Sequence, residues 1–185
     1  MAVLKSEHLY TYADLLTWSE EERWELFGGF PVMQAAPSTM HQRIERNFLV
    51  EIAGFLKGKP CEVFSPLSVR LEPKKNNTDK TVFAPDIVVV CDKTKLDKNG
   101  CNGAPDFIIE VLSPSTAKYD RKIKLEAYRR CGVREYWIAD PAEKIVQAHI
   151  LNNGHYIVNA YDEDDVIPVH TLSGLEISLV EIFID

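Results

Sequence analysis

The sequence predicts an α/β fold of the α+β type, in which helices pack on a central mixed β-sheet. Three short apolar runs, residues 86–91, 106–112 and 135–139, are rich in β-branched and aromatic side chains, as buried strands are. Two longer segments have apolar residues at helical spacing, and they do not alternate strictly with the strands. The length of 185 residues, with 45% hydrophobic and 26% charged residues, predicts a single globular domain, residues 1–185.

The N-terminal third of the chain predicts two helices and a hairpin. Residues 12–22 combine apolar side chains with acidic ones at the end, which favours a first helix. Residues 24–34 carry a Gly-Gly pair between two apolar runs, the signal of a two-residue hairpin turn. Ser38 is a suitable N-cap for a second helix that ends at Gly58, and its apolar residues follow the helical period: Ile44, Phe48, Ile52 and Phe55.

The remaining elements are short strands and one helix. The polar loop 72–80 is expected to be the most flexible segment, and residues 92–104 form a polar connection between two strands. The helix at 116–130 ends at Gly132, a common signal at helix C-termini. Strands are predicted at 61–64, 68–71, 86–91, 106–112, 135–139, 144–150, 155–161 and 175–179.

The charge balance bears on which partners the protein can bind. The chain has 21 Lys+Arg against 28 Asp+Glu, a net charge of −7, which argues against broad coating of nucleic acid or anionic membrane but leaves room for a local basic site. The longest apolar run, residues 87–91, is far shorter than the about 20 residues of a bilayer span. The N-terminal segment has no apolar core of signal-peptide length. We therefore expect a cytoplasmic protein with no membrane partner.

Several common signatures are absent from the sequence. It has no P-loop, no dinucleotide-binding glycine fingerprint and no nucleophile elbow. The four cysteines stand far apart, which argues against a structural zinc site. In a chain without a secretion signal we expect them to be reduced thiols buried near the strands: Cys61, Cys91, Cys101 and Cys131.

Two of the predicted buried strands carry acidic residues. If these strands pair antiparallel with a turn near residue 98, Asp86 lies opposite Glu110, with Cβ atoms roughly 5 Å apart. Two carboxylates this close repel each other, and burial increases the cost unless a divalent cation lies between them. The alternative is structural, because Asp86 could simply start a strand after Pro85 while Glu110 pairs with a basic side chain. The residue types leave both interpretations open.

The helix predicted at 116–130 is the most basic part of the chain. Together with Arg134 just beyond it, this segment has seven basic residues against two acidic ones. Its charged face is either solvated, with i,i+4 pairs such as Asp120 with Lys124, or it supplies cations to a phosphodiester site beside the two acids. Lys124 borders the apolar stripe of the helix, so it can reach the edge of the sheet.

Three further polar residues are candidates for the same site. His41 and Glu45 lie one helical turn apart and share a face of the second helix. His41 is either a proton carrier near phosphate or ordinary polar surface near a helix start. Glu25 and Glu45 are each a candidate third acid, and the sequence does not choose between them.

Three runs of the sequence form a recognisable pattern. They are 84–92 with Pro85-Asp86, 103–115 with Glu110, and 120–141 with Lys124; the N-terminal segments Glu25-Leu26…Gly29 and Pro37-Ser38…His41-Gln42 accompany them. Together they resemble the Uma2 family, which looks like a branch of the PD-(D/E)XK restriction-endonuclease-like superfamily. The resemblance spans residues 10–183.

This resemblance implies a restriction-endonuclease-like core, in which a central mixed sheet flanked by helices carries an extra N-terminal hairpin and C-terminal strands. It also implies an Mg²⁺-dependent nuclease site, with Mn²⁺ as an alternative ion. By the resemblance, Asp86 and Glu110 are the metal-binding acids, and the backbone carbonyl of Val111 is a further ligand.

The resemblance also implies the catalytic residues that complete the site. The lysine of the motif should stand at Leu112, and the family places it instead at Lys124 on the next helix. His41, together with Glu25 or Glu45, would complete the catalytic set.

We therefore expect an endonuclease that hydrolyses phosphodiester bonds of nucleic acid, DNA rather than RNA. The alternative is a nuclease-like fold that has lost catalysis and serves as a binding or assembly module, which the missing strand lysine and the acidic charge favour. A third hypothesis is a structural protein in which Asp86, Lys124 and Glu110 form a buried ion network. A homodimer is expected because double-strand cutting in this superfamily typically uses two copies.

Overall fold

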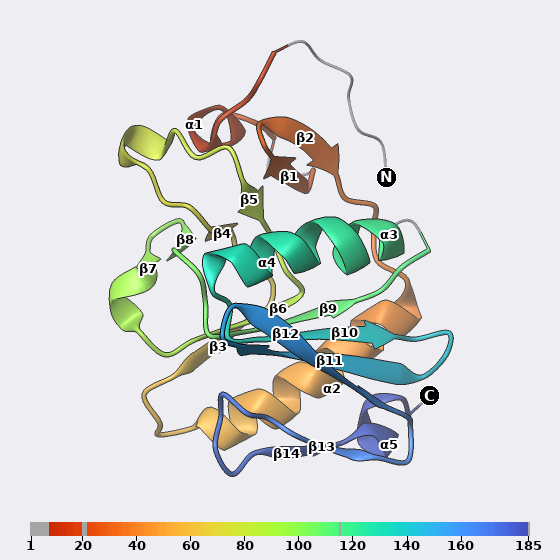
Figure 1. The fold of residues 1–185 in the computed structure, drawn as a ribbon. Helices are drawn as coiled ribbons and strands as arrows, with labels where there is room; N and C mark the ends of the chain where they lie inside the picture. The colour runs from red at the N-terminus through yellow and green to blue at the C-terminus, as the bar shows by residue number, and fades with distance from the viewer. Residues whose placement is uncertain (1–7, 20–21, 115, 185) are drawn as a thin grey trace.

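The computed structural model describes residues 8–19, 22–114 and 116–184, and its centre is a six-stranded mixed sheet (Figure 1). The strand order is β12-β11-β10-β9-β6-β3, in which β9 and β10 run parallel and every other neighbouring pair is antiparallel. This main sheet confirms the predicted central mixed sheet. Its strands are β3 (Glu62–Phe64), β6 (Ile87–Val90), β9 (Phe107–Val111), β10 (Glu135–Asp140), β11 (Ile145–Asn152) and β12 (His155–Tyr161).

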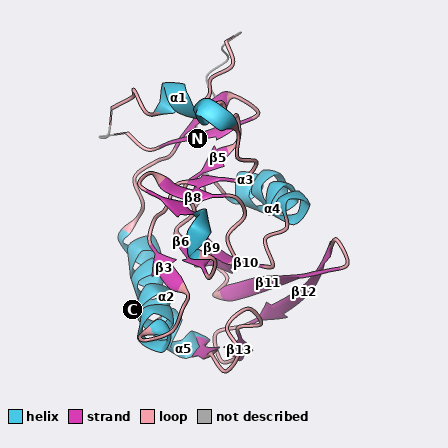
Figure 2. Ribbon diagram, turned by 90° about the vertical axis from the view of Figure 1, so that its left-hand side faces the viewer, coloured by secondary structure: helices cyan, strands magenta, loops and turns pink. Residues whose placement is uncertain are grey.

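Helices cover both faces of the main sheet (Figure 2). One face carries α2 (Thr39–Leu56) together with the C-terminal β13 (Val166–Pro168), β14 (Glu176–Ser178) and α5 (Leu179–Ile182). The other face carries a continuous helical segment of α3 (Ala117–Tyr119), the π-helical η3 (Asp120–Lys124) and α4 (Leu125–Cys131). Because both faces are covered, β6 is buried along its whole length, which explains its unbroken apolar sequence.

A second six-stranded sheet, in the order β2-β1-β5-β4-β8-β7, shares a hydrophobic core with α4. It includes the predicted N-terminal hairpin, and residues 92–104, expected to be a simple connection, supply two of its strands and the short helix η2 (Lys93–Lys95). The polar loop 72–80 holds the one-turn helix η1 (Lys75–Asn77). The strands are β1 (Trp24–Phe27), β2 (Phe30–Met33), β4 (Val69–Arg70), β5 (Val82–Phe83), β7 (Leu96–Asp97) and β8 (Gly100–Asn102).

The β1–β2 hairpin has the turn that its glycines predict. Phe27 and Phe30 are the last paired residues, so Gly28 and Gly29 alone make the turn. Their φ angles are 59° and 88°, in the left-handed region that a two-residue type I′ turn requires and that glycine adopts without strain.

Helix α2 follows its sequence signals closely. The Ser38 side chain accepts a hydrogen bond from the backbone N–H of His41 at 3.2 Å, so Ser38 is the N-cap. Ile44, Phe48 and Ile52 are buried against the main sheet. No helix within the described ranges, α2 included, has both the length and the apolar character needed to cross a membrane.

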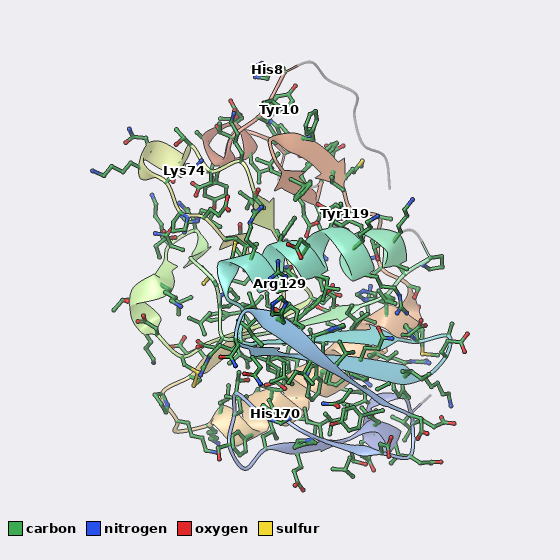
Figure 3. The ribbon with its side chains drawn as sticks, viewed as in Figure 1. His8, Tyr10, Lys74, Tyr119, Arg129 and His170 are labelled. Carbon is green, nitrogen blue, oxygen red and sulfur yellow. A yellow bond between two sulfur atoms is a disulfide. The ribbon has the colours of Figure 1, made fainter. Side chains whose placement is uncertain are left out.

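The first helix is much shorter than the predicted span 12–22, although residues 20–21 lie outside the described residues. Helix α1 covers only Tyr12–Leu15. Trp18 lies beyond it and packs edge-on between Tyr10 and Trp24, with ring centroids 5.2 and 5.3 Å apart. Figure 3 places Tyr10 at the end of the molecule that carries the β1–β2 hairpin. Contacts between aromatic rings from three segments therefore replace the further helical turns.

Two of the four cysteines form a disulfide, which corrects the expectation of four reduced thiols. Strands β3 and β6 are antiparallel with Glu62 opposite Val90, so the next position outward brings Cys61 opposite Cys91. The two cysteines are thirty residues apart, and this spacing does not reveal the register of the strands that brings their sulfur atoms together. Cys101 and Cys131 are free, as expected.

The C-terminal part has the predicted strands 144–150 and 155–161 as a long hairpin, together with two short elements that the sequence did not predict, β13 and α5. Strands β11 and β12 extend the main sheet, and the Arg129 guanidinium lies between α4 and this hairpin, where it donates to the carbonyl of Gly154 at 2.6 Å (Figure 3). Strand β13 and helix α5 have three and four residues, which is too short for a periodic pattern to identify.

His149 of β11 is buried among aromatic rings. Its ring centroid lies 5.8 Å from that of Tyr136 and 5.7 Å from that of Tyr156. Neither ring nitrogen has a hydrogen-bond partner in the described part of the chain. Burial, with a smaller effect of the Arg121 charge, lowers the pKa of His149 to about 4.

We predict that His149→Phe makes the fold less sensitive to acid. In the unfolded chain His149 binds a proton below pH about 6.5, whereas in the folded chain it does so only below pH about 4. Between these pH values the unfolded state binds more protons, so the free energy of unfolding falls as the pH drops. Between pH 7 and pH 5 the native protein should lose about 2 kcal/mol more than the variant. Urea unfolding at both pH values measures this, and equal losses would contradict it.

Candidate active site

A buried lysine lies among three carboxylates beside the C-terminal end of β9. The Nζ atom of Lys124 is 2.7 Å from Oε1 of Glu110, 2.9 Å from Oε1 of Glu25 and 3.6 Å from Oδ1 of Asp120. All four residues are at least 96% buried. They come from η3, β9 and β1, so three elements that are distant in sequence meet at this ammonium group.

The helix expected at 116–130 contains a π-helical segment at this point. In η3 the helix widens, and both Asp120 and Lys124 are buried toward the sheet, while the neighbouring Arg121 and Lys122 are exposed. π-turns within α-helices are frequent at functional sites. The widened turn thus contributes two charged groups to the interior from one short segment.

The two acids that contact Lys124 most closely are held by further hydrogen bonds. Glu25 Oε1 accepts from the backbone N–H of Ala84 at 2.9 Å, and its Oε2 accepts from Nε2 of Gln34 at 2.6 Å. Glu110 Oε1 accepts from the hydroxyl of Tyr128 at 3.0 Å. These contacts fix the orientation of both carboxylates before any ligand binds.

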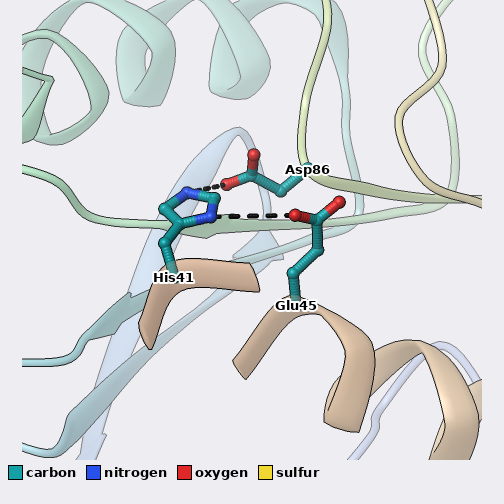
Figure 4. Close-up of side chains that lie close together, drawn as sticks. All are labelled: His41, Glu45 and Asp86. Carbon is teal, nitrogen blue, oxygen red and sulfur yellow. Dashed lines mark ion pairs between the residues drawn. The ribbon is translucent and has the colours of Figure 1, made fainter. Parts of the chain in front are cut away.

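A second cluster consists of His41, Asp86 and Glu45 (Figure 4). His41 Nε2 lies 3.2 Å from Oδ2 of Asp86, and Nδ1 lies 3.7 Å from Oε2 of Glu45. One potential ligand atom from each residue falls within 4.8 Å of the others. His41 is 8% exposed, which excludes the interpretation of this residue as ordinary polar surface.

The pairing of β6 with β9 brings the two clusters together. Ile87 lies opposite Ile109, which is the register expected for Asp86 opposite Glu110, although the connection between the strands is longer and more structured than a turn. Asp86 Oδ2 accepts from the backbone N–H of Val111 at 2.8 Å. The amide of Val111 thus holds Asp86 in position, and the prediction that the Val111 carbonyl is a metal ligand stays a prediction.

Burial and like charges shift the protonation equilibria of these groups. Burial raises the pKa of Glu110 well above its usual range, Lys124 opposes this, and the charge of Asp120 adds to it. Burial alone would lower the pKa of Lys124, but the adjacent carboxylates outweigh it and raise that pKa. For His41, burial is likewise outweighed, chiefly by Asp86, and the pKa is raised. Lys124 is therefore a firmly held cation.

The two clusters lie along a cavity of about 680 Å³. Of the predicted residues, His41, Asp86, Glu110, Val111 and Lys124 line it, whereas Glu25 supports Lys124 from behind and Glu45 supports His41. The rest of the wall is largely small and apolar, with Arg23, Gln34, Asp120 and Asp140 as its additional charged or amide side chains.

Sequence reasoning gave three residues no role in this site: Tyr128, Gln34 and Asp120, which it named only as a solvated partner of Lys124. Asp120 and Tyr128 stand four positions before and after Lys124, so the helical period already puts them on one face, although it does not show that this face is buried. Gln34 pairs with Glu25 only through the hairpin and carried no signal of its own.

The donor set fits a divalent cation that prefers oxygen ligands. Three buried carboxylates, from Glu25, Glu110 and Asp120, surround a single lysine, so acidic groups outnumber the ammonium group there. The half-buried Asp86 adds a fourth carboxylate, whose charge acts on Glu110. In the described part of the chain no hydrogen bond engages Oδ1 of Asp86 or Oε2 of Glu110, so each acid keeps one oxygen for an ion. Such oxygens are the ligands that Mg²⁺ and Mn²⁺ select.

A mixed sheet with acids on two adjoining strands and a lysine beside them defines a protein of the restriction-endonuclease-like class. The family model of Uma2, described as "Putative restriction endonuclease", matches residues 11–180. The chain therefore belongs to the Uma2 family.

Two further comparisons agree with this family. The chain is 25% identical over 175 residues to "Uncharacterized protein slr1290" of Synechocystis sp., with 92% of this chain and 89% of that protein covered. Its fold is similar to the crystal structure of "a putative nuclease belonging to DUF820" from Anabaena variabilis, with a TM-score of 0.75 at 22% identity, over 94% of this chain and 97% of the other. The comparison establishes a nuclease fold.

We predict that Lys124→Met destabilises the protein by about 3–5 kcal/mol, because it leaves buried carboxylates without their cation. The matched control is Lys122→Met, two positions away on the same helical segment but exposed, which should change stability by less than about 0.5 kcal/mol. Chemical unfolding of both variants measures the difference. If the two were equally stable, Lys124 would not be the buried counter-charge that the structure indicates.

Proposed function

We propose that this protein is a divalent-metal-dependent endonuclease that hydrolyses phosphodiester bonds of nucleic acid. The observation that carries the proposal is the buried excess of carboxylates at the cavity, with Asp86 and Glu110 side by side. The Uma2 family and the nuclease fold of the relative from Anabaena variabilis support the reaction class. The family description favours DNA as the first substrate to test.

Asp86 and Glu110 are the residues that would hold the ion, Mg²⁺ or Mn²⁺. When bound, such an ion supplies a polarised phosphate and a water molecule of lowered pKa. His41 Nε2 lies 3.2 Å from Oδ2 of Asp86 as an ion-pair partner, and the amide of Val111 donates to the same oxygen, so the second oxygen of Asp86 has a fixed direction.

Lys124 would stabilise the negative charge that develops on the phosphate. Its pKa is raised, so it stays protonated and acts as a fixed cation; it is not available as a general base. Glu25 positions this ammonium group, because its own carboxylate is tied to Ala84 and Gln34. The charge is thus in place before substrate arrives, and no reorganisation is needed during the reaction.

We predict that Asp86→Asn lowers the cleavage rate by roughly a hundredfold or more, since the loss of a metal-binding charge costs several kcal/mol in the transition state. The thermal melt should be unchanged or raised, because one of several repelling carboxylates is removed. The control is Asp164→Asn, an exposed residue remote from the cavity lining. A folded Asp86→Asn protein that cleaves normally refutes the site, and a large loss of stability favours the structural ion network.

We predict that the protein binds Mg²⁺ or Mn²⁺ at millimolar concentrations and that Asp86→Asn and Glu110→Gln each weaken this binding. Titration calorimetry measures the affinity, and a metal-dependent rise of the melting temperature gives an independent readout. Asp164→Asn should bind as the native protein does. The absence of metal binding by the folded native protein would favour the alternative of a nuclease-like binding module.

A further inference from the structure

We propose that the substrate enters this cavity as an unpaired strand, so that single-stranded nucleic acid is cleaved in preference to duplex. The inference rests on the proposed nuclease function and adds the strandedness of its substrate. Three features of the cavity carry it: the depth of the reacting groups, the construction of its rim and the small number of cations in its wall.

The groups assigned to the chemistry lie at the bottom of the cavity. Glu110 and Lys124 are 4% and 2% exposed, and the side chain of Asp86 is 19% exposed. A phosphate must therefore enter the cavity to contact them. Duplex DNA is stiff, with a persistence length of about 50 nm, so presenting one of its phosphates to groups inside a cavity requires a costly deformation of the duplex. An unpaired strand has no such restriction, and enzymes that work in closed pockets use single strands or expel nucleotides from the duplex.

Loops from several directions form the wall of the cavity. Four prolines from four different connections line it: Pro37 between β2 and α2, Pro66 between β3 and β4, Pro114 after β9 and Pro141 after β10. The volume of about 680 Å³ lies within the range of about 300–1,000 Å³ that is typical of pockets for small ligands. A space of this size accommodates a few nucleotide groups, whereas a duplex needs an open cleft.

The wall carries too few cations to hold a duplex along its length. Among the described residues that line the cavity, Arg23 and Lys124 are the only arginine or lysine, against Asp86, Glu110, Asp120 and Asp140. Proteins that hold duplex DNA commonly neutralise about 6–10 phosphates. Two cations are enough to neutralise one or two phosphates of a single strand.

Arg23 indicates the side on which the strand enters. It is exposed at the base of the β1–β2 hairpin, where its carbonyl accepts from the backbone N–H of Gln34 at 2.8 Å. Lys124 is buried, so Arg23 is the exposed cation of the lining and the first that a phosphate approaching from solvent meets. We assign it to a phosphate of the entering strand.

The test compares one labelled sequence as a single strand, as a blunt duplex and as a hairpin with an unpaired loop, each in DNA and RNA. Fluorescence anisotropy in EDTA measures binding, and gel analysis with Mg²⁺ or Mn²⁺ measures cleavage. We expect at least tenfold tighter binding and faster cleavage of the single strand than of the duplex, and hairpin cleavage confined to the loop. Duplex cleavage at an equal or higher rate overturns this inference and leaves the proposed function intact. If folded protein binds and cleaves no nucleic acid, both fail.

The role of Arg23 is tested by the salt dependence of binding. Arg23→Gln should reduce the slope of log affinity against log salt by about 0.7 for a single strand, the contribution of one phosphate contact. Arg130→Gln, an exposed arginine on α4 outside the cavity, should leave the slope unchanged. An unaltered slope in Arg23→Gln overturns entry of the strand past this residue.

Discussion

The ion cluster around Lys124 is the interaction on which the arrangement of this protein depends. A lysine that is 2% exposed is costly unless its ammonium group is fully paired, and here it is paired with acids from β9, β1 and its own helical segment. The second sheet, through Glu25, and the helical layer, through Lys124, are thereby tied to the main sheet at one point. Loss of the lysine would leave several carboxylates buried without compensation.

The charges of this cluster are not balanced, as they would be in a purely structural ion network. A stable buried network would balance its charges, but the carboxylates here outnumber the ammonium group, and burial raises the pKa of Glu110 well above its usual range. An excess of buried negative charge lowers the stability of the fold, and such destabilising groups are commonly found at sites of binding or catalysis. The disposition of Asp86, with one oxygen tied to His41 and Val111 and the other outside any hydrogen bond of the described residues, is consistent with a ligand that arrives later.

Much of this architecture was predictable from local signals. Because side chains in a strand alternate, Glu110 and Phe107 of β9 lie on opposite faces of the sheet, and the two cores show this. Ser38 and the apolar period of α2 predicted that helix well, because a cap and a four-turn stripe are strong local signals. The Trp18 region was mispredicted because aromatic contacts with Tyr10 and Trp24 are not local.

The sequence by itself determined the strands of the main sheet, the Ser38 cap, the Gly28-Gly29 turn and the presence of acids at two buried strands, because each depends on side chains a few positions apart. Only the tertiary structure decided which groups meet. The register of β3 on β6 joined Cys61 to Cys91, and the π-turn aimed both Asp120 and Lys124 inward. The tertiary structure also placed Gln34 behind Glu25 and brought four separate connections together along one cavity. These features depend on contacts between distant segments, whose geometry is set by the packing of the whole fold and has no local signature in the chain.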